Sequence, residues 1–187
     1  MLAVYIIIGI VVILLIMLAS TYNGLVRLRN RVKNAWAQID VQLKRRHDLI
    51  PNLVETAKGY MTHERGTFEA VTKARNLAQQ AVGTGVGTQS KAEGELSSAL
   101  ARLLVVVENY PDLKANQNFL ALQEELTSTE NKISFSRQYY NDSVLRYNNK
   151  TQMFPSNIIA GVMGFKASEF FEVKAAEERE APKVSFS

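Results

Sequence analysis

The sequence predicts an all-α protein in which an N-terminal transmembrane helix precedes an up-and-down bundle of about four long helices. Residues 2–19 carry no charge, and Gly9 is the one residue among them that is not apolar. After this stretch, apolar residues recur every three or four positions, which is the period of a helix and not of a strand. Only four prolines, at positions 51, 111, 155 and 182, interrupt that pattern.

The apolar stretch predicts a membrane anchor over residues 1–21. Eighteen helical residues rise about 27 Å, enough to cross the hydrocarbon core of a bilayer. A secretory signal would carry basic residues before the stretch and a small-x-small cleavage site after it. Nothing basic precedes residue 2, and the Leu18-Ala19-Ser20 sequence matches a cleavage site only weakly. A core helix would rarely be apolar on all sides, and the lack of cysteine excludes lipoprotein attachment.

Basic residues after the anchor predict its orientation. Between residues 27 and 46 the chain has seven Lys and Arg residues and one acid, Asp40. Because such an excess favours the cytoplasmic side, we expect the N-terminus outside and the C-terminal domain in the cytoplasm. The basic stretch lacks interleaved aromatic residues, so nucleic-acid binding is not expected. The residues expected to contact the membrane surface are Arg27, Arg29, Arg31, Lys33, Phe170 and Phe171.

The remaining residues predict one helical-bundle domain, 22–180, with a disordered tail at 181–187. We expect helices at 22–48, 52–82, 93–109 and 116–149, with Pro51 kinking or ending the first. Residues 83–91 predict a flexible glycine-rich loop, because their spacing does not match a phosphate-binding loop and no strand precedes them. Residues 154–165 are too short to span a bilayer and either cap the core or lie at the membrane surface. Residues 169–180 predict a short amphipathic helix.

Catalytic sets are missing from the sequence. His47 and His63 each precede an acid, but neighbouring residues on a helix point to different faces. Neither an H-E-x-x-H nor an E-x-x-H arrangement is present, and without cysteine no Cys-His pair can form. We therefore expect no catalytic residues, no metal and no cofactor, and we expect both histidines at surface or capping positions.

A polar cluster lies directly before Pro51. A proline kink leaves backbone carbonyls unbonded, and nearby cationic side chains can satisfy them. The alternative is that this cluster contacts a partner or a second copy at the bend. These residues are Lys44, Arg45, Arg46, His47, Asp48 and Pro51. On the 116–149 helix, further polar residues could meet this cluster across the bundle and fix helix register, namely Glu124, Glu125, Glu130 and Asn131.

Several ordered runs of residues resemble the LemA family of bacterial membrane proteins. They are YNxLV at 22–26, NAWAQIDVQLKRRHDLIPNLV at 34–54, YPDLKAN at 110–116, LQEEL at 122–126, TENKI at 129–133 and YYND at 139–142. The resemblance covers the chain from the anchor to about residue 171. It implies a single N-terminal span with a short external end, a cytoplasmic helical bundle and a place in the bacterial cell envelope. Together with the predicted orientation, we expect the inner membrane. It implies no reaction, catalytic residue or cofactor.

The predicted anchor, the predicted bundle and the lack of a recognisable set of catalytic residues favour a membrane-anchored scaffold or adaptor. We expect it to self-associate, because anchors that share one orientation raise the effective concentration of their bundles. Its expected partners are membrane lipid, further copies of itself and an unidentified envelope protein. One alternative is a regulator that couples membrane state to a cytoplasmic partner through the kink at Pro51. Others are an enzyme that uses His63 and Glu64, and a membrane-shaping protein whose residues 158–165 or Phe170 and Phe171 insert into lipid.

Overall fold

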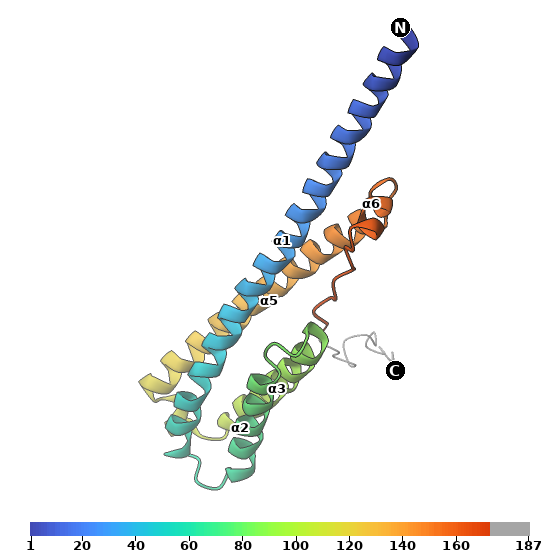
Figure 1. The fold of residues 1–187 in the computed structure, drawn as a ribbon. Helices are drawn as coiled ribbons and strands as arrows, with labels where there is room; N and C mark the ends of the chain where they lie inside the picture. Colours follow the sequence, from blue (N-terminus) through green and yellow to red (C-terminus); the bar gives the residue numbers. More distant parts are fainter. Residues whose placement is uncertain (173–187) are drawn as a thin grey trace, which may run out of the picture. The chain divides into compact units, whose positions relative to one another are not determined.

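The computed structural model describes residues 1–172, and it confirms the all-α fold, because those residues form helices and no strand (Figure 1). The helices are α1 (Leu2–Lys58), α2 (Arg65–Gln80), α3 (Val86–Val107), α4 (Pro111–Lys114), α5 (Gln117–Gln152) and α6 (Ser156–Val162). They form two compact units. Unit 1 comprises Met1–Val41 and Ser134–Phe170, and unit 2 comprises Gln42–Ile133 with residues 171–172. Helices α1 and α5 therefore supply residues to both units.

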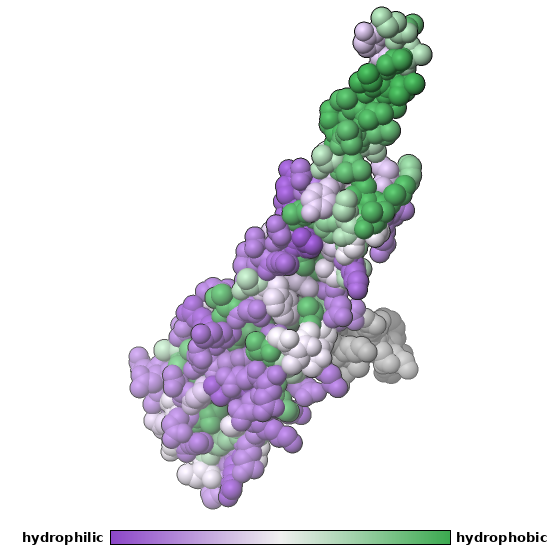
Figure 2. Space-filling view, viewed as in Figure 1, coloured by the Kyte–Doolittle hydropathy of each residue, from purple (hydrophilic) through white to green (hydrophobic). Residues whose placement is uncertain are grey.

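The N-terminal part of α1 exposes its apolar side chains. Every large apolar residue from Leu2 to Leu18 is exposed, with Leu2 at 78% and Leu18 at 44%. In the described part of the chain, α1 is the one helix long and apolar enough to cross a membrane, and none of its apolar window is buried. Figure 2 shows this segment as an almost unbroken hydrophobic surface. A core helix would bury these side chains, so their exposure supports the predicted anchor.

Helix α1 continues through Pro51, and the chain turns later than the sequence predicts. The turn occupies residues 59–64, so the expected helix at 52–82 is in fact the end of α1 followed by α2. The carbonyl of Ala57 accepts bonds from the N–H groups of Tyr60 and Met61, both at 3.0 Å, and the Met61 side chain is buried. The helix ends there because the Ala57 carbonyl is satisfied and the Met61 side chain is buried. Pro51 does not end the helix.

The glycine-rich loop is shorter than predicted. Helix α3 begins at Val86, so residues 86–91 are helical and not part of a connector. Gly83 and Gly85 have φ angles of 79° and 124°, in the region that side chains with a Cβ rarely adopt. Those two glycines are enough to make the turn. The residues after Gly85 belong to the bundle, because Gln89 and Ser90 among them are buried.

Unit 1 has a core formed by α1 and the C-terminal half of α5. Its buried residues on α1 recur at spacings of seven, three and four, and they are Leu25, Val32, Ala35 and Ile39. Its buried residues on α5 follow the same helical period, and they are Tyr140, Val144 and Tyr147. The rings of Trp36 and Tyr140 pack edge to face with centroids 5.3 Å apart. Full burial of each large apolar side chain contributes about 1.5–3 kcal/mol.

After α6, residues 165–170 form an extended segment that is bonded to side chains of α5. Tyr147 Oη donates to the Lys166 carbonyl at 2.9 Å, and Tyr140 Oη donates to the Glu169 carbonyl at 2.8 Å. Asn148 Nδ2 donates to the Ser168 carbonyl at 2.9 Å, while the Ser168 N–H donates to Asn148 Oδ1 at 2.8 Å. These side chains satisfy backbone groups that have no ladder of their own.

The tyrosine donors of this segment stay protonated at neutral pH. Burial, together with the nearby Glu169 carboxylate, raises the pKa of Tyr140 to about 12.

Residues 169–172 are extended, so the predicted helix at 169–180 does not begin at residue 169. The rest of that predicted helix and the predicted tail at 181–187 lie outside the described residues.

Unit 2 has a second core, to which α1, α2, α3 and α5 all contribute. Helices α2 and α3 lie side by side (Figure 1). The largest buried side chains of this core include Ile50, Leu53, Met61, Phe68, Leu96, Leu103, Leu113 and Phe119. The four long helices of the predicted bundle are thus present, with α4 as an additional single turn that leads into α5.

Replacing Asn148 by Ala tests how the extended segment is held. The change removes both bonds to Ser168, and at about 1 kcal/mol per bond it is expected to lower the free energy of unfolding by about 2 kcal/mol. The neighbouring Asn149 is exposed, so Asn149→Ala is the matched control, with an expected effect within about 0.5 kcal/mol. Urea unfolding of the full chain in detergent micelles measures both. Equal effects of the two substitutions would show that the Asn148 bonds do not hold the segment.

Candidate functional site

Arg46 lies inside unit 2 and not on its surface. Its side chain is 1% exposed. It occupies the buried stripe of α1, three residues after Leu43 and four before Ile50, both of which are buried. The helical period therefore directs the guanidinium group into the bundle. A charge in this position requires partners that compensate for its lost hydration.

Two acids from two other helices supply that compensation. Arg46 Nη2 contacts the Glu93 carboxylate of α3, whose side chain is 3% exposed. Arg46 Nη1 donates to Glu130 Oε2 of α5 at 2.6 Å and to Ser97 Oγ of α3 at 2.8 Å. A single guanidinium thus joins α1, α3 and α5. We call Arg46, His47, Glu93, Ser97 and Glu130 the Arg46 cluster.

His47 contacts the second oxygen of Glu93. His47 Nε2 lies 2.9 Å from Glu93 Oε1, and both side chains are almost fully buried. Burial acts to raise the pKa of Glu93, but contact with His47 and the positive charge of Arg46 outweigh burial, so the net pKa lies below its ordinary value of 4.5. Glu93 is therefore ionised at neutral pH. The Arg46–Glu93 contact is a buried ion pair and not a neutral hydrogen bond.

Pro51 has a specific consequence for the same part of α1. Proline lacks the N–H that would bond the carbonyl four residues earlier, which belongs to His47. Arg75 of α2 replaces that donor, because its Nε donates to the His47 carbonyl at 2.8 Å. A cation does satisfy a carbonyl freed by Pro51, as the sequence predicts. The cation comes from α2, however, and not from the 44–46 cluster.

The structure brings together some of the predicted polar residues and leaves others in solvent. Arg45 pairs with Glu125 at 2.6 Å, and this pair is half-exposed. Glu130 joins Arg46, as described above. The other members of the two predicted sets are exposed, namely Lys44, Asp48, Pro51, Glu124 and Asn131. His63 is exposed as expected, but the surface or capping position expected for His47 is wrong, because the His47 side chain is buried against Glu93.

Sequence reasoning missed Glu93 and Ser97, although a signal for Glu93 is present. The buried positions 89, 93, 96, 100 and 103 of α3 form one helical stripe, and Glu93 is its one charged residue. Arg46 and His47 likewise fill a gap in the apolar stripe of α1. A base and an acid on facing apolar stripes are expected to pair inside a bundle, because neither can otherwise be buried.

The predicted membrane-surface residues lie in different environments. Arg27, Arg29, Arg31 and Lys33 are exposed. The Arg29 guanidinium also lies 5.0 Å from the centroid of the Phe165 ring. Phe170 is partly exposed, whereas Phe171 is buried and would have to leave its position to reach lipid. Membrane contact by these residues stays a prediction.

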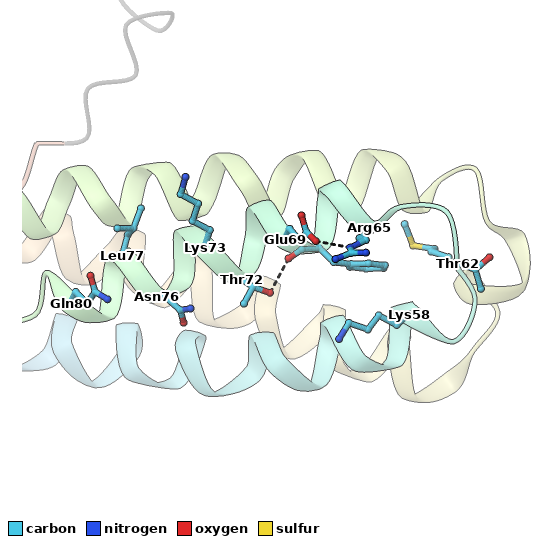
Figure 3. Close-up of a pocket in the computed structure, with 11 residues that line it drawn as sticks. Lys58, Thr62, Arg65, Glu69, Thr72, Lys73, Asn76, Leu77 and Gln80 are labelled. Carbon is cyan, nitrogen blue, oxygen red and sulfur yellow. Dashed lines mark hydrogen bonds and ion pairs between the residues drawn. The ribbon is translucent and has the colours of Figure 1, made fainter.

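A groove lies along α2 beside the end of α1, with a volume of about 710 Å³ (Figure 3). Its side chains are largely polar, and within it Arg65 pairs with Glu69 at 2.7 Å. It shares no residue with the Arg46 cluster. Nearby, Glu64 accepts a hydrogen bond from Tyr110 Oη at 3.0 Å.

The arrangement of the Arg46 cluster suits a structural task. Its acid and base are held at fixed positions by three helices, and its central groups are closed off from solvent. Any shift of one helix by a turn would separate Arg46 from Glu93 and leave two unpaired buried charges. We therefore interpret the cluster as the element that fixes helix register in unit 2.

Replacing Glu93 by Gln tests this interpretation. The substitution keeps the shape of the side chain and removes its charge, so that of the two acids paired with Arg46 only Glu130 keeps its charge. We expect the free energy of unfolding to fall by about 2 kcal/mol at neutral pH, the range for losing a hydrogen bond to a charged group. Urea unfolding of the full chain in detergent measures this loss.

The control is Glu125→Gln, which removes the half-exposed pair with Arg45 and should cost less than about 1 kcal/mol. Glu93→Gln should also change how stability responds to acid. Because folding lowers the pKa of Glu93, its stabilising contribution is present above about pH 4.5 and is lost as the pH falls through the folded pKa. Glu93→Gln should therefore flatten the acid limb of stability. An unchanged acid limb in Glu93→Gln would contradict the assignment.

Replacing Arg75 by Ala tests the role of Pro51. The substitution leaves the His47 carbonyl without a donor and should cost about 1–3 kcal/mol. In a Pro51→Ala background the restored N–H can bond that carbonyl, so Arg75→Ala should cost distinctly less. A double-mutant cycle on the unfolding free energy measures the coupling. Additive effects would mean that Arg75 does not compensate for the proline.

Comparison with known proteins places this architecture in a family. The model of the LemA family matches residues 35–186. The chain is 25% identical to magnetosome protein MamQ 2 of Paramagnetospirillum magneticum, over 85% of this chain and 67% of that protein. It is 24% identical to MamQ of Magnetospirillum gryphiswaldense, with the same coverage, and 27% identical to protein LemA of Metamycoplasma hominis, over 81% of this chain and 71% of that protein. Because the family model matches most of the chain, this protein belongs to the LemA family.

Proposed function

We propose that the protein is a membrane-anchored scaffold of the bacterial cell envelope, which self-associates and presents a helical bundle to other envelope proteins. One observation carries this proposal. A single uninterrupted helix, α1, supplies the exposed apolar segment, the core of unit 1 and the Arg46 of unit 2. A helix that serves as both anchor and core element ties the bundle directly to the bilayer.

The use of charged groups inside the bundle supports a structural role. Arg46, His47 and Glu93 are occupied with one another, and Arg75 is occupied with the His47 carbonyl. The names of the three relatives above refer to the magnetosome and to LemA, and none refers to a reaction. We propose that the chain is not an enzyme and that its surface, not a catalytic centre, carries its function.

The proposed location is the inner membrane, with the N-terminus outside and the part of the chain that follows the apolar segment of α1 in the cytoplasm. The support is the distribution of charge. Arg27, Arg29, Arg31 and Lys33 are all exposed within the first turns after the apolar segment. Basic residues close to a span are retained on the cytoplasmic side.

Exposed apolar side chains of unit 1 offer surfaces for self-association. Phe135 is 72% exposed and Val41 is 64% exposed. An anchored chain meets other copies in one orientation, so a modest contact suffices for association in the membrane. We propose that the face of α5 that carries Phe135 contacts a second copy.

Photo-crosslinking in the native membrane tests the scaffold proposal. A photoreactive phenylalanine analogue at Phe135 of the full chain should give adducts of twice the monomer mass, together with a small set of reproducible adducts to envelope proteins. The exposed Gln79 of α2 is the control position, where the same probe should give few adducts. Adducts should be identified by mass spectrometry. If Phe135 and Gln79 give the same weak pattern, or if only monomer is found, the scaffold proposal is wrong.

A further inference from the structure

Helix α6 and the turns beside it carry large apolar side chains on the outside of unit 1. Phe154 and Val162 are each 79% exposed, and they are among the most exposed apolar residues after the N-terminal segment. Single exposed apolar residues are common, but a cluster within eleven positions of the chain is not. We call Met153, Phe154, Ile158, Val162 and Met163 the α6 apolar surface.

The inward face of α6 is built from small residues. Ser156 and Ala160, four positions apart, are buried, whereas Ile158 and Val162 lie on the opposite face and are exposed. Ser156 Oγ is also within hydrogen-bonding distance of the carbonyls of Lys150, at 2.6 Å, and Met153, at 2.8 Å. The helix is thus seated by its small residues and turns its large apolar ones outward. That is the reverse of the usual pattern for a soluble protein.

The α6 apolar surface lies beside the point where the apolar segment of α1 ends. Phe165, which follows α6, packs against Tyr22 with ring centroids 5.8 Å apart. Tyr22 is only three residues beyond Ala19, the last residue of the apolar stretch. Figures 1 and 2 agree with this placement within unit 1, since α6 and its hydrophobic side chains lie near α1 just after the exposed apolar segment.

The charges around α6 favour a lipid surface. No Asp or Glu occurs from residue 150 to residue 168, and Lys150 and Lys166 flank the apolar residues on either side. Both lysines are exposed. Lys and Arg near a bilayer surface attract anionic headgroups, and apolar side chains beside them can enter the headgroup and acyl boundary.

We infer that α6 is a second membrane contact, which lies in the interface of the same leaflet at which α1 emerges. At seven residues α6 is far too short to span the bilayer. It instead inserts its outward face shallowly, while the bonds of residues 165–170 to α5 hold its C-terminal end to unit 1. The protein then contacts the membrane at two places, which limits how unit 1 can tilt about its anchor.

Lipid fits this surface better than a second copy does, because the surface lies beside the end of the apolar segment of α1 and is flanked by lysines. The inference rests on the membrane span of the proposed function. The experiment below therefore includes a position within the span, so that failure of the span and failure of the α6 contact give different results.

Depth-dependent fluorescence quenching in vesicles tests the inference. The natural chain has no cysteine, so single cysteines can be labelled cleanly. Ile158→Cys and Val162→Cys carry an environment-sensitive dye in the full chain, reconstituted in vesicles of phosphatidylcholine and phosphatidylglycerol. Both probes should lose most of their fluorescence to a lipid quencher placed near the headgroups, and little to iodide in the water. Circular dichroism establishes that each labelled variant is helical.

Two further positions serve as controls. Leu15→Cys, within the apolar segment, should be quenched by a lipid quencher near the bilayer centre. Gln38→Cys, exposed on α1 about 28 Å beyond Ala19, should be quenched by iodide and not by lipid. If Leu15 responds to lipid and the α6 probes respond only to iodide, the inference is overturned and the span stands. If the α6 probes are shielded from both quenchers and the same cysteine variants without dye form disulfide-linked dimers, a second copy covers the surface and the lipid assignment is wrong. If Leu15 is not quenched by lipid, the span itself and everything that rests on it fail.

Discussion

Burial of the Arg46 guanidinium is the constraint on which unit 2 depends. A buried charge costs several kcal/mol unless partners compensate for it, and the partners here come from two other helices. Glu93 of α3 is buried with it, and Glu130 of α5 reaches it from a partly exposed position. Apolar stripes tolerate the sliding of one helix along another, because one leucine takes the place of the next. An ion pair does not tolerate such sliding, so the Arg46 cluster selects a single register among the ways the same helices could pack.

The same helix connects this constraint to the membrane. Helix α1 supplies the apolar segment, then a buried stripe in unit 1, then Arg46. Pro51 would weaken such a helix, but Arg75 donates to the carbonyl that the proline leaves free. In unit 1, side chains of α5 hold residues 165–170 and so position α6 near the end of the apolar segment. Polar groups in both units thus position helices.

The sequence predicts the helices well where one physical effect dominates. The helix expected at 116–149 is α5 (Gln117–Gln152), because its apolar period is long and uninterrupted. Prediction failed where a distant residue decided the outcome. Pro51 did not end α1, since a donor from α2 replaced its missing N–H. No helix begins at residue 169, where the Glu169 carbonyl accepts a hydrogen bond from Tyr140 of α5. Glu124, Glu125 and Glu130 were proposed as acids that could meet the basic cluster. Glu125 and Glu130 pair with Arg45 and Arg46, whereas Glu124 is exposed. Glu93, at the start of the helix expected at 93–109, was not among the proposed acids.

The central claim is that one buried guanidinium, through its ion pairs with Glu93 and Glu130, holds α1, α3 and α5 together. Amide hydrogen exchange of the full chain in lipid nanodiscs, compared between the natural protein and Glu93→Gln, tests it most directly. The account predicts that amides flanking Arg46 on α1, Glu93 on α3 and Glu130 on α5 lose protection together and to a similar extent. Faster exchange confined to α3, with α1 and α5 unchanged, would contradict the claim and would reduce the Arg46 cluster to a local contact.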